Sequence, residues 1–236
     1  MTKRNTLKTL ASASLVALGL VGAGLLSILM VVGVAMVMAY PQLPDTSDLA
    51  EYRPKLPLRI FTADGALMGE FGEERRNLTP IREIPQVMKD AVLAIEDARF
   101  YEHGGIDPVG VLRAAIVMLT TGEKKQGAST ITMQVARNFF LTRDKTIIRK
   151  VKEIFISYHI EELLTKDEIL ELYVNRIYLG QRAYGVGAAA QVYFGKNVQE
   201  LSLSELAVIA GLPKAPSRFN PLVNPTRALE RRDWIL

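Results

Sequence analysis

A cluster of acidic, aromatic and histidine side chains is the first part of the chain whose residue types could carry out chemistry. It runs from Glu96 to Gly104 and places Glu96, Phe100 and His103 at positions i, i+4 and i+7. On a helix these three share one face, while Asp97 is turned about 100° away. A carboxylate beside an aromatic ring is partly shielded from water, which suits it to accept a proton. Taken alone, the cluster fits a solvated helix end equally well, with His103 as a structural hydrogen-bonding group.

A polar stripe follows in the segment 127–138. Thr130, Gln134 and Arg137 fall on one helical face, with Asn138 close to it. Arginine grips phosphate oxygens bidentately, so the stripe suits a phosphate or diphosphate. In isolation the same stripe is better explained as the wet face of an amphipathic helix.

A third cluster combines two cations with a carboxylate. Arg149 and Lys150 could hold a diphosphate leaving group, with Glu153 as a second carboxylate nearby. Arg149 and Glu153 are also four residues apart, so a surface ion pair, which is worth little, explains this segment by itself.

The order of these clusters is more specific than any one of them. Together with two later segments they resemble the family 51 glycosyltransferases, the peptidoglycan polymerases, whose motifs read E-D-x-x-F-x-x-H, G-[AG]-S-T-[IL]-T-x-Q, R-K-x-x-E, E-L-Y-x-N with A-Y-G-x-x-A-A-A, and L-x-E-x-A-x-[IL]-A-G-L-P. The matching segments are Glu96–Gly104, Gly127–Gln134, Arg149–Glu153, Glu171–Ala190 and Leu203–Pro213. The match covers roughly residues 55–230, and five ordered motifs far exceed the specificity of a lone one.

The resemblance implies a mainly α, lysozyme-like glycosyltransferase domain that polymerises lipid II into β-1,4-linked strands. Glu96 would be the base, the MurNAc anomeric carbon would be inverted, and undecaprenyl diphosphate would leave. Glu153 would be the second catalytic carboxylate, on the leaving-group side, where it would either hold a divalent cation, Mg or Mn, against the diphosphate or help the diphosphate to leave. The same resemblance implies sensitivity to moenomycin.

The resemblance also supplies a set of substrate-binding residues. These are Asp97, Phe100, His103, Ser129, Thr130, Gln134, Arg137, Asn138, Arg149, Lys150, Asn175 and Tyr184. Arg137 stands where many relatives carry lysine, and either cation can neutralise a diphosphate.

The apolar periodicity predicts the helices that must position these residues. Helices are expected from Pro85 to a stop at Gly104-Gly105, and then over 108–121, 129–141, 145–164 and 166–174. The segment 183–193 is rich in small residues and can pack closely. Ser202 to Glu205 forms a capping box before a helix that Pro213 ends. Residues 58–62 and 67–71 flank an Asp-Gly turn and predict a β-hairpin, expected to be the only sheet. The glycine-bounded segment 122–127 is expected to be a mobile loop.

An apolar run of about 30 residues predicts one N-terminal transmembrane helix. No charged residue occurs between Lys8 and Asp45. The expected division is a cytoplasmic tail (1–9), an anchor (10–40), a proline-rich connector (41–57) and the glycosyltransferase domain (58–236). Basic residues before the run and acidic residues after it place the domain outside the cytoplasm, at the inner membrane and in the periplasm. A cleaved signal peptide is the competing interpretation, but its apolar region is usually half as long.

Composition excludes several classes of site. The 236 residues contain no cysteine and two histidines, which rules out disulfides, cysteine-ligated metals and histidine-rich metal sites. The net charge of +4 fits an anionic membrane or a phosphate-bearing substrate. Nucleic-acid binding is not expected, because no dense basic patch occurs.

Two other functions remain open alternatives. One is a lysozyme-like lytic hydrolase, and the other is a catalytically silent membrane scaffold of the cell-wall machinery. The connector and hairpin resemble those of the bifunctional class A penicillin-binding proteins of Gram-negative bacteria. Because no transpeptidase motif follows, the chain is expected to be the N-terminal part of such a protein, or else a monofunctional relative. The resemblance implies cell-wall assembly proteins and an outer-membrane activator as partners.

Overall fold

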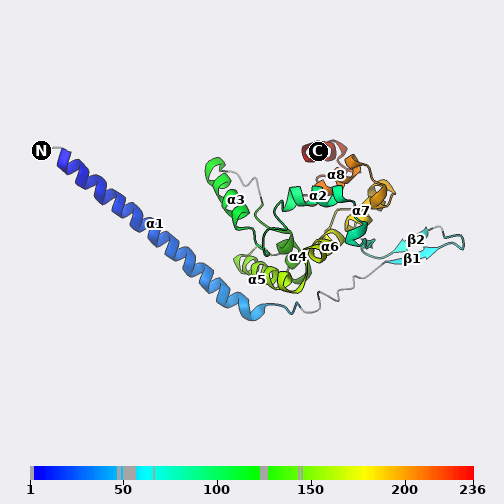
Figure 1. Cartoon of the computed structure of the whole chain (residues 1–236), viewed down its shortest axis with the longest axis horizontal. Helices are drawn as coiled ribbons and strands as arrows, with labels where there is room; N and C mark the ends of the chain where they lie inside the picture. The colour runs from blue at the N-terminus through cyan, green and yellow to red at the C-terminus, as the bar shows by residue number, and fades with distance from the viewer. Residues whose placement is uncertain are drawn as a thin grey trace. The chain divides into compact units, whose positions relative to one another are not determined.

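The computed structural model describes residues 3–46, 49, 57–65, 67–122, 127–142, 144 and 146–236. These fall into two compact units (Figure 1). One contains Met1–Leu43 and Asp144–Lys152, and the other contains Pro44–Arg143 and Glu153–Leu236. The expected loop at 123–126 and most of the expected connector lie outside the described residues.

The first unit contains α1, a helix from Lys3 to Ala39. Its stretch Gly22–Ala39 has a mean hydropathy of 2.3, and 18 residues of this kind approach the length that crosses a bilayer. The predicted apolar N-terminal helix is therefore confirmed. Pro41 lies in the short 3₁₀ turn Tyr40–Gln42 that follows, because proline is tolerated in a first helical turn but not in a helix interior.

The second unit is mainly helical. Its helices are α2 (Gln86–Glu96), α3 (Pro108–Thr121), α4 (Ile131–Phe140), most of α5 (Ile147–Leu163), α6 (Lys166–Arg176), α7 (Val186–Phe194), α8 (Leu203–Gly211) and α9 (Pro225–Ile235), with 3₁₀ turns η3 (Ile81–Glu83) and η4 (Val198–Glu200). α4 packs on α6, and α8 contacts both α2 and α9 (Figure 1). Fully buried aliphatic side chains such as Ile131, Ile169 and Ile209 fill these contacts.

Two small sheets accompany the helices. β1 (Leu58–Phe61) and β2 (Leu67–Phe71) form the predicted antiparallel hairpin, with a turn through Gly65 at φ 86°. The expectation of a single sheet is wrong, because β3 (Arg75–Arg76) pairs in parallel with β4 (Ala183–Tyr184). Two residues per strand are too few to show an alternating pattern. The sequence therefore contains no signal that predicts the pairing of these two distant segments.

The predicted capping box at the start of α8 is confirmed. The Ser202 side chain accepts from Glu205 N–H, and the Glu205 carboxylate accepts from Ser202 N–H at 2.8 Å. Lys196 Nζ donates to the other carboxylate oxygen at 2.8 Å. The hydrogen bond from Lys196, followed by that from the Ser202 backbone, lowers the pKa of Glu205 to about 2.

This depressed pKa predicts an acid-dependent contribution to stability. A carboxyl whose folded pKa lies below its unfolded value stabilises the fold above the unfolded pKa, and the contribution disappears as pH falls through the folded pKa. We expect Glu205→Gln to lower the melting temperature near neutral pH and to match the unmodified protein near pH 2. Thermal unfolding followed from neutral to acid pH measures this, with the exposed Glu230→Gln as control. An equal difference at both ends of the range would contradict it.

Candidate active site

A cleft of about 520 Å³ opens between the end of α2 and the start of α4. Its remaining walls come from the loop before α3 and its first turns, from Pro213 and Lys214 after α8, and from α9. All of these lining residues belong to the second unit. The cleft is therefore a property of the helical domain itself.

Glu96 is the last residue of α2 and lies in the cleft wall. Gln134, on α4, donates from Nε2 to Glu96 Oε2 at 2.8 Å. Gln134 is only 7% exposed, so packing fixes its amide and hence the orientation of the carboxylate. Among the described residues this is the hydrogen bond that Glu96 makes, which leaves Oε1 for a ligand.

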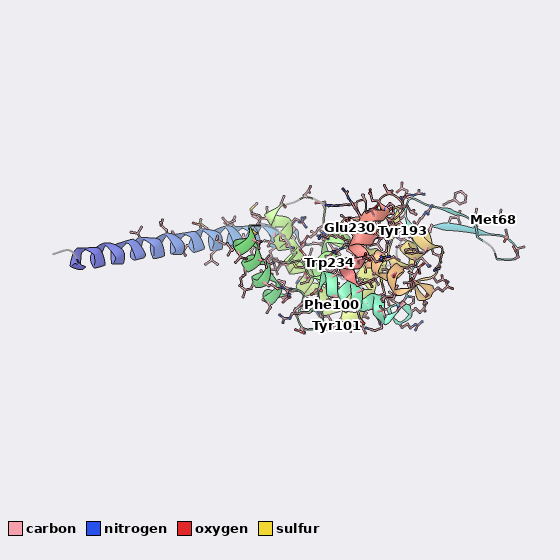
Figure 2. The ribbon with its side chains drawn as sticks, turned by 90° about the horizontal axis from the view of Figure 1, so that it is seen from above. Met68, Phe100, Tyr101, Tyr193, Glu230 and Trp234 are labelled. Atoms are coloured by element: carbon pink, nitrogen blue, oxygen red, sulfur yellow. The ribbon has the colours of Figure 1, made fainter. Side chains whose placement is uncertain are left out.

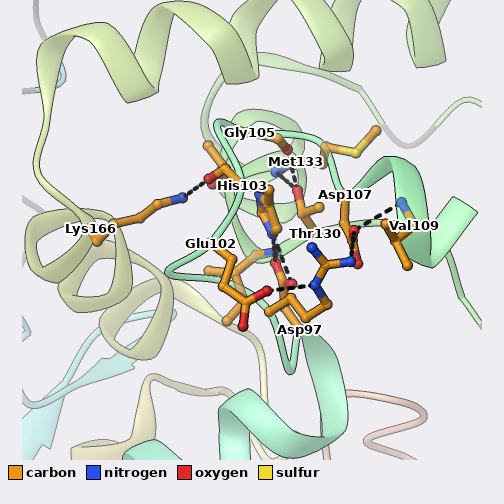
Figure 3. Close-up of polar contacts among 12 residues, drawn as sticks. Asp97, Glu102, His103, Gly105, Asp107, Val109, Thr130, Met133 and Lys166 are labelled. Carbon is orange, nitrogen blue, oxygen red and sulfur yellow. Dashed lines mark hydrogen bonds and ion pairs between the residues drawn. The ribbon is translucent and has the colours of Figure 1, made fainter.

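The predicted helical continuation from Glu96 to Gly104 is wrong. α2 ends at Glu96, and Asp97 adopts φ −162° and ψ 75°, so Glu96, Phe100 and His103 do not share a helical face. The cause is a tertiary contact of the Asp97 carboxylate (Figure 3). It accepts from Ile131 N–H at 2.9 Å, at the start of α4, and lies 2.9 Å from His103 Nε2. Because unpaired N–H groups and the helix dipole favour an anion at a helix start, this contact overrides local helix propensity.

A second set of contacts fixes the turn after Glu96 (Figure 3). Thr130, the N-cap of α4, donates from Oγ1 to Gly105 O at 2.6 Å and accepts from Met133 N–H. Gly105 has φ 90°, and a Cβ there would come within 3.2 Å of the Ser157 backbone, so only glycine fits. Lys166 Nζ donates to His103 O at 2.6 Å. The turn that follows Glu96 is thus held by hydrogen bonds and is not a loose loop.

The acidic and basic side chains around the cleft differ in whether they have charged partners. Asp97 is engaged by His103, and Asp107 lies 3.4 Å from Arg99, so two of the acidic groups already have partners. Four basic side chains line the cleft and make no ion pair with any described residue: Arg113, Arg137, Lys214 and Arg231. Several unpaired cations around one carboxylate create a positive potential that suits a multiply charged anion.

The structure brings several of the predicted site residues together. Those that line the cleft are Glu96, Asp97, Ser129, Thr130, Gln134 and Arg137. Phe100 and His103 are buried beside them, and Lys166 Nζ lies 4.4 Å from the centre of the Phe100 ring. These two side chains support the turn and do not line the cleft.

Other predicted residues have different surroundings in the described part of the chain. Asn175 accepts from Thr79 N–H and donates to Thr79 O, both at 2.9 Å, so its amide holds the chain after β3. Tyr184 packs against the Arg76 guanidinium, 4.7 Å from the ring centre. Neither residue lines the cleft.

The remaining predicted residues lie on α4 and α5. The Asn138 carbonyl accepts from Arg176 at 3.4 Å, and Glu153 is buried at 1% exposure; neither is among the cleft-lining residues of the described chain. Arg149 and Lys150 lie in the first turn of α5, in the other compact unit. Their roles stay predictions.

Several residues near the chemistry were missed by sequence reasoning, among them Arg113 of α3, which lines the cleft. Lys214, Arg231 and Trp234 line the cleft from the C-terminal side. Tyr173, on α6, is 1% exposed, and its hydroxyl has no hydrogen-bond partner among the described residues. Burial and the charge of Glu96 raise its pKa well above the usual value, whereas Arg137 lowers it. Tyr173 belongs to the E-L-Y segment, and this motif is the one feature of the sequence that could have identified it as a site residue.

Comparisons with known proteins bear on this geometry. The family model described as Transglycosylase matches residues 64–236. Penicillin-binding protein 1A of Escherichia coli (strain K12) is 60% identical over 196 residues, covering 83% of this chain and 23% of that protein. Penicillin-binding protein 1A of Neisseria gonorrhoeae is 54% identical over 205 residues, covering 87% and 26%. The chain thus spans about a quarter of the length of these relatives.

A solved structure is also similar. Penicillin-binding protein 1A from Haemophilus influenzae has 35% sequence identity and a TM-score of 0.42, covering 78% of this chain and 18% of that one. The match of the family model over most of the chain agrees with the five ordered motifs. The chain belongs to the transglycosylase family.

Proposed function

We propose that this domain is a peptidoglycan glycosyltransferase that polymerises lipid II. The observation that carries the proposal is the position of Glu96, which Gln134 orients in a cleft lined by four unpaired cations. A carboxylate held in this way can take a proton, and the cations can neutralise a diphosphate. Membership of the transglycosylase family supports the same chemistry.

The proposed reaction is an inverting displacement. Glu96 Oε1 takes the proton from the 4-hydroxyl of the acceptor GlcNAc as that oxygen bonds to C1 of the donor MurNAc. The bond between C1 and the phosphate oxygen breaks on the opposite face, and undecaprenyl diphosphate leaves with the electron pair. Arg137, together with Arg149 and Lys150, would stabilise the charge that develops on the diphosphate.

Glu153 is proposed to act on the leaving-group side, where it would help to hold a divalent cation (Mg or Mn) that would neutralise charge on the diphosphate. A single carboxylate suits such a hard cation only with further oxygen ligands. The described residues contain no cluster of three or more acidic or histidine side chains. The substrate phosphates and water would therefore complete the coordination, and the cation would supply charge neutralisation.

We propose a single-pass inner-membrane protein with the cleft in the periplasm. Lys3, Arg4 and Lys8 precede the apolar part of α1, which favours a cytoplasmic N-terminus. α3 is apolar and has no buried side chain, with Leu119 84% exposed, so its apolar residues do not form part of the core. An exposed apolar helix beside the cleft suits contact with the lipid of the substrate or with the bilayer surface.

Incubation of the detergent-solubilised chain with lipid II tests the proposed activity. We expect glycan strands to lengthen and undecaprenyl diphosphate to accumulate. A lytic hydrolase would instead shorten preformed glycan without elongation, and a silent scaffold would do neither. The unpaired cations favour polymerisation over hydrolysis, since a glycan strand without diphosphate would leave them unneutralised.

A further inference from the structure

The C-terminal helix α9 contributes a wall to the cleft that none of the five motifs includes. α9 carries Trp234 and Glu230 (Figure 2), and Arg231 lies between them in sequence. Arg231 and Trp234 line the cleft together with Lys214. The properties of these side chains indicate which ligand the wall binds.

Arg231 is a buried cation that makes no direct ion pair with any described residue, although the charge of Glu96 acts on it from a distance. It is 9% exposed, and its Nε has no hydrogen-bond partner among those residues. Taking a guanidinium out of water without a partner is costly, and burial lowers the pKa of Arg231 while the charge of Glu96 raises it. A cation kept under these conditions in a cleft wall indicates that an anionic ligand supplies the missing charge.

Packing holds the Arg231 guanidinium in place. A Cβ on Gly211 of α8 would lie 2.8 Å from Arg231 Cγ, so the glycine allows the arginine stem to pass closely. The guanidinium carbon lies 4.3 Å from the centre of the Trp234 ring. A stacked, fixed guanidinium loses little further entropy on binding an anion, which is the geometry of a binding site rather than of a mobile surface side chain.

Trp234 offers a different kind of contact. It is 68% exposed although it lines the cleft, so a wide apolar ring face is open to a ligand. The C–H face of a pyranose ring packs well on such a surface, while the sugar hydroxyls stay in water. Arg231 and Trp234 therefore provide adjacent contacts for an anion and a sugar.

We propose that Lys214, Arg231 and Trp234 form a second substrate-binding wall, which holds the diphosphate and the adjoining sugar of a lipid-linked saccharide. This inference rests on the proposed function, since it takes the substrate class from there. It assigns Arg231 to the diphosphate and Trp234 to the face of the sugar. Arg137, on α4, remains free to serve the other substrate molecule.

Because the chain contains a single tryptophan, its fluorescence emission reports on ligand binding at this wall. Lipid II is titrated into the full-length Glu96→Gln variant while tryptophan emission is recorded, so binding is followed without turnover. We expect a saturable change in emission, and inorganic pyrophosphate should reverse part of it. Adding Arg231→Met should raise the half-saturating concentration by about tenfold, because one charge-assisted contact is lost.

The matched control is Arg227→Met, which removes one exposed arginine from the same helix outside the cleft and should leave half-saturation unchanged. Equal affinities of the Arg231→Met and Arg227→Met variants, or no saturable change in emission, would overturn the proposal. Failure of polymerisation by the unmodified chain, with emission still responding through Arg231, would instead remove the proposed reaction alone.

Kinetics separate binding from a structural role. In the otherwise unmodified chain, Arg231→Met should raise KM for lipid II by about tenfold with kcat nearly unchanged. Arg231→Lys should recover part of that loss. A fall in kcat and in melting temperature with an unchanged KM would show that Arg231 is only structural and would refute the assignment.

Discussion

Replacement of Glu96 by glutamine is expected to reduce glycan polymerisation by about 100- to 10,000-fold, the range over which a positioned general base contributes. Glutamine has nearly the same shape but cannot take the proton of the acceptor hydroxyl. Its amide can still pair with Gln134, whose side chain also offers an acceptor, so the fold should be retained. Lipid II polymerisation under single-turnover conditions measures the effect, and thermal unfolding checks the fold.

The control for this variant is Glu102→Gln. Glu102 lies in the same segment, is exposed and pairs with Arg99, and it does not line the cleft. It should polymerise lipid II at nearly the unmodified rate. Activity of Glu96→Gln within a few-fold of that control would show that Glu96 is not the base and that another group takes the proton.

The second large effect concerns stability. We expect Asp97→Ala to lower the free energy of unfolding by roughly 2–5 kcal/mol, because two buried donors each lose their acceptor at about 1–3 kcal/mol. The Asp97 and His103 side chains are each 3% exposed, and both His103 Nε2 and Ile131 N–H would lose the acceptor that Asp97 supplies. Urea-induced unfolding measures the change.

Asp90→Ala is the matched control, because Asp90 is an exposed carboxylate on α2 that accepts from the nearby Gln86 side chain. It should change the free energy of unfolding by less than about 0.5 kcal/mol. A loss in Asp97→Ala no larger than in Asp90→Ala would show that the buried network is not a stabilising one.

Sequence patterns predicted the regular part of the fold because local signals and packing agree there. The helix at Pro108–Thr121 has the expected bounds, with Asp107 as N-cap and Gly122 as a left-handed C-cap. The capping box before α8 was likewise readable from four residues. The pattern failed after Glu96, where a carboxylate found a partner 34 residues away in sequence. A contact between residues far apart in the sequence produces no periodic pattern of apolar residues.

The site residues that belong to sequence motifs were predicted. The site residues that stand outside any motif were missed. Ser129, Thr130, Gln134 and Arg137 share one segment, and the structure brings that segment to Glu96. Arg231 and Trp234 look like ordinary residues of an amphipathic helix, and only the packing of α9 on α8 turns them toward the cleft. The burial of Arg231 and the position of Trp234 in the cleft are tertiary properties.

The bond between Asp97 and Ile131 N–H has a consequence for how this segment can vary in evolution and in engineering. It ties the residue after Glu96 to the start of the helix that carries Gln134, while His103 closes the other side of the same carboxylate. The segment of five residues between Asp97 and His103 therefore has a fixed length, and its composition is constrained at the buried Phe100. Substitutions at exposed positions such as Tyr101 should be tolerated, whereas inserting or deleting one residue should separate the two halves of the site.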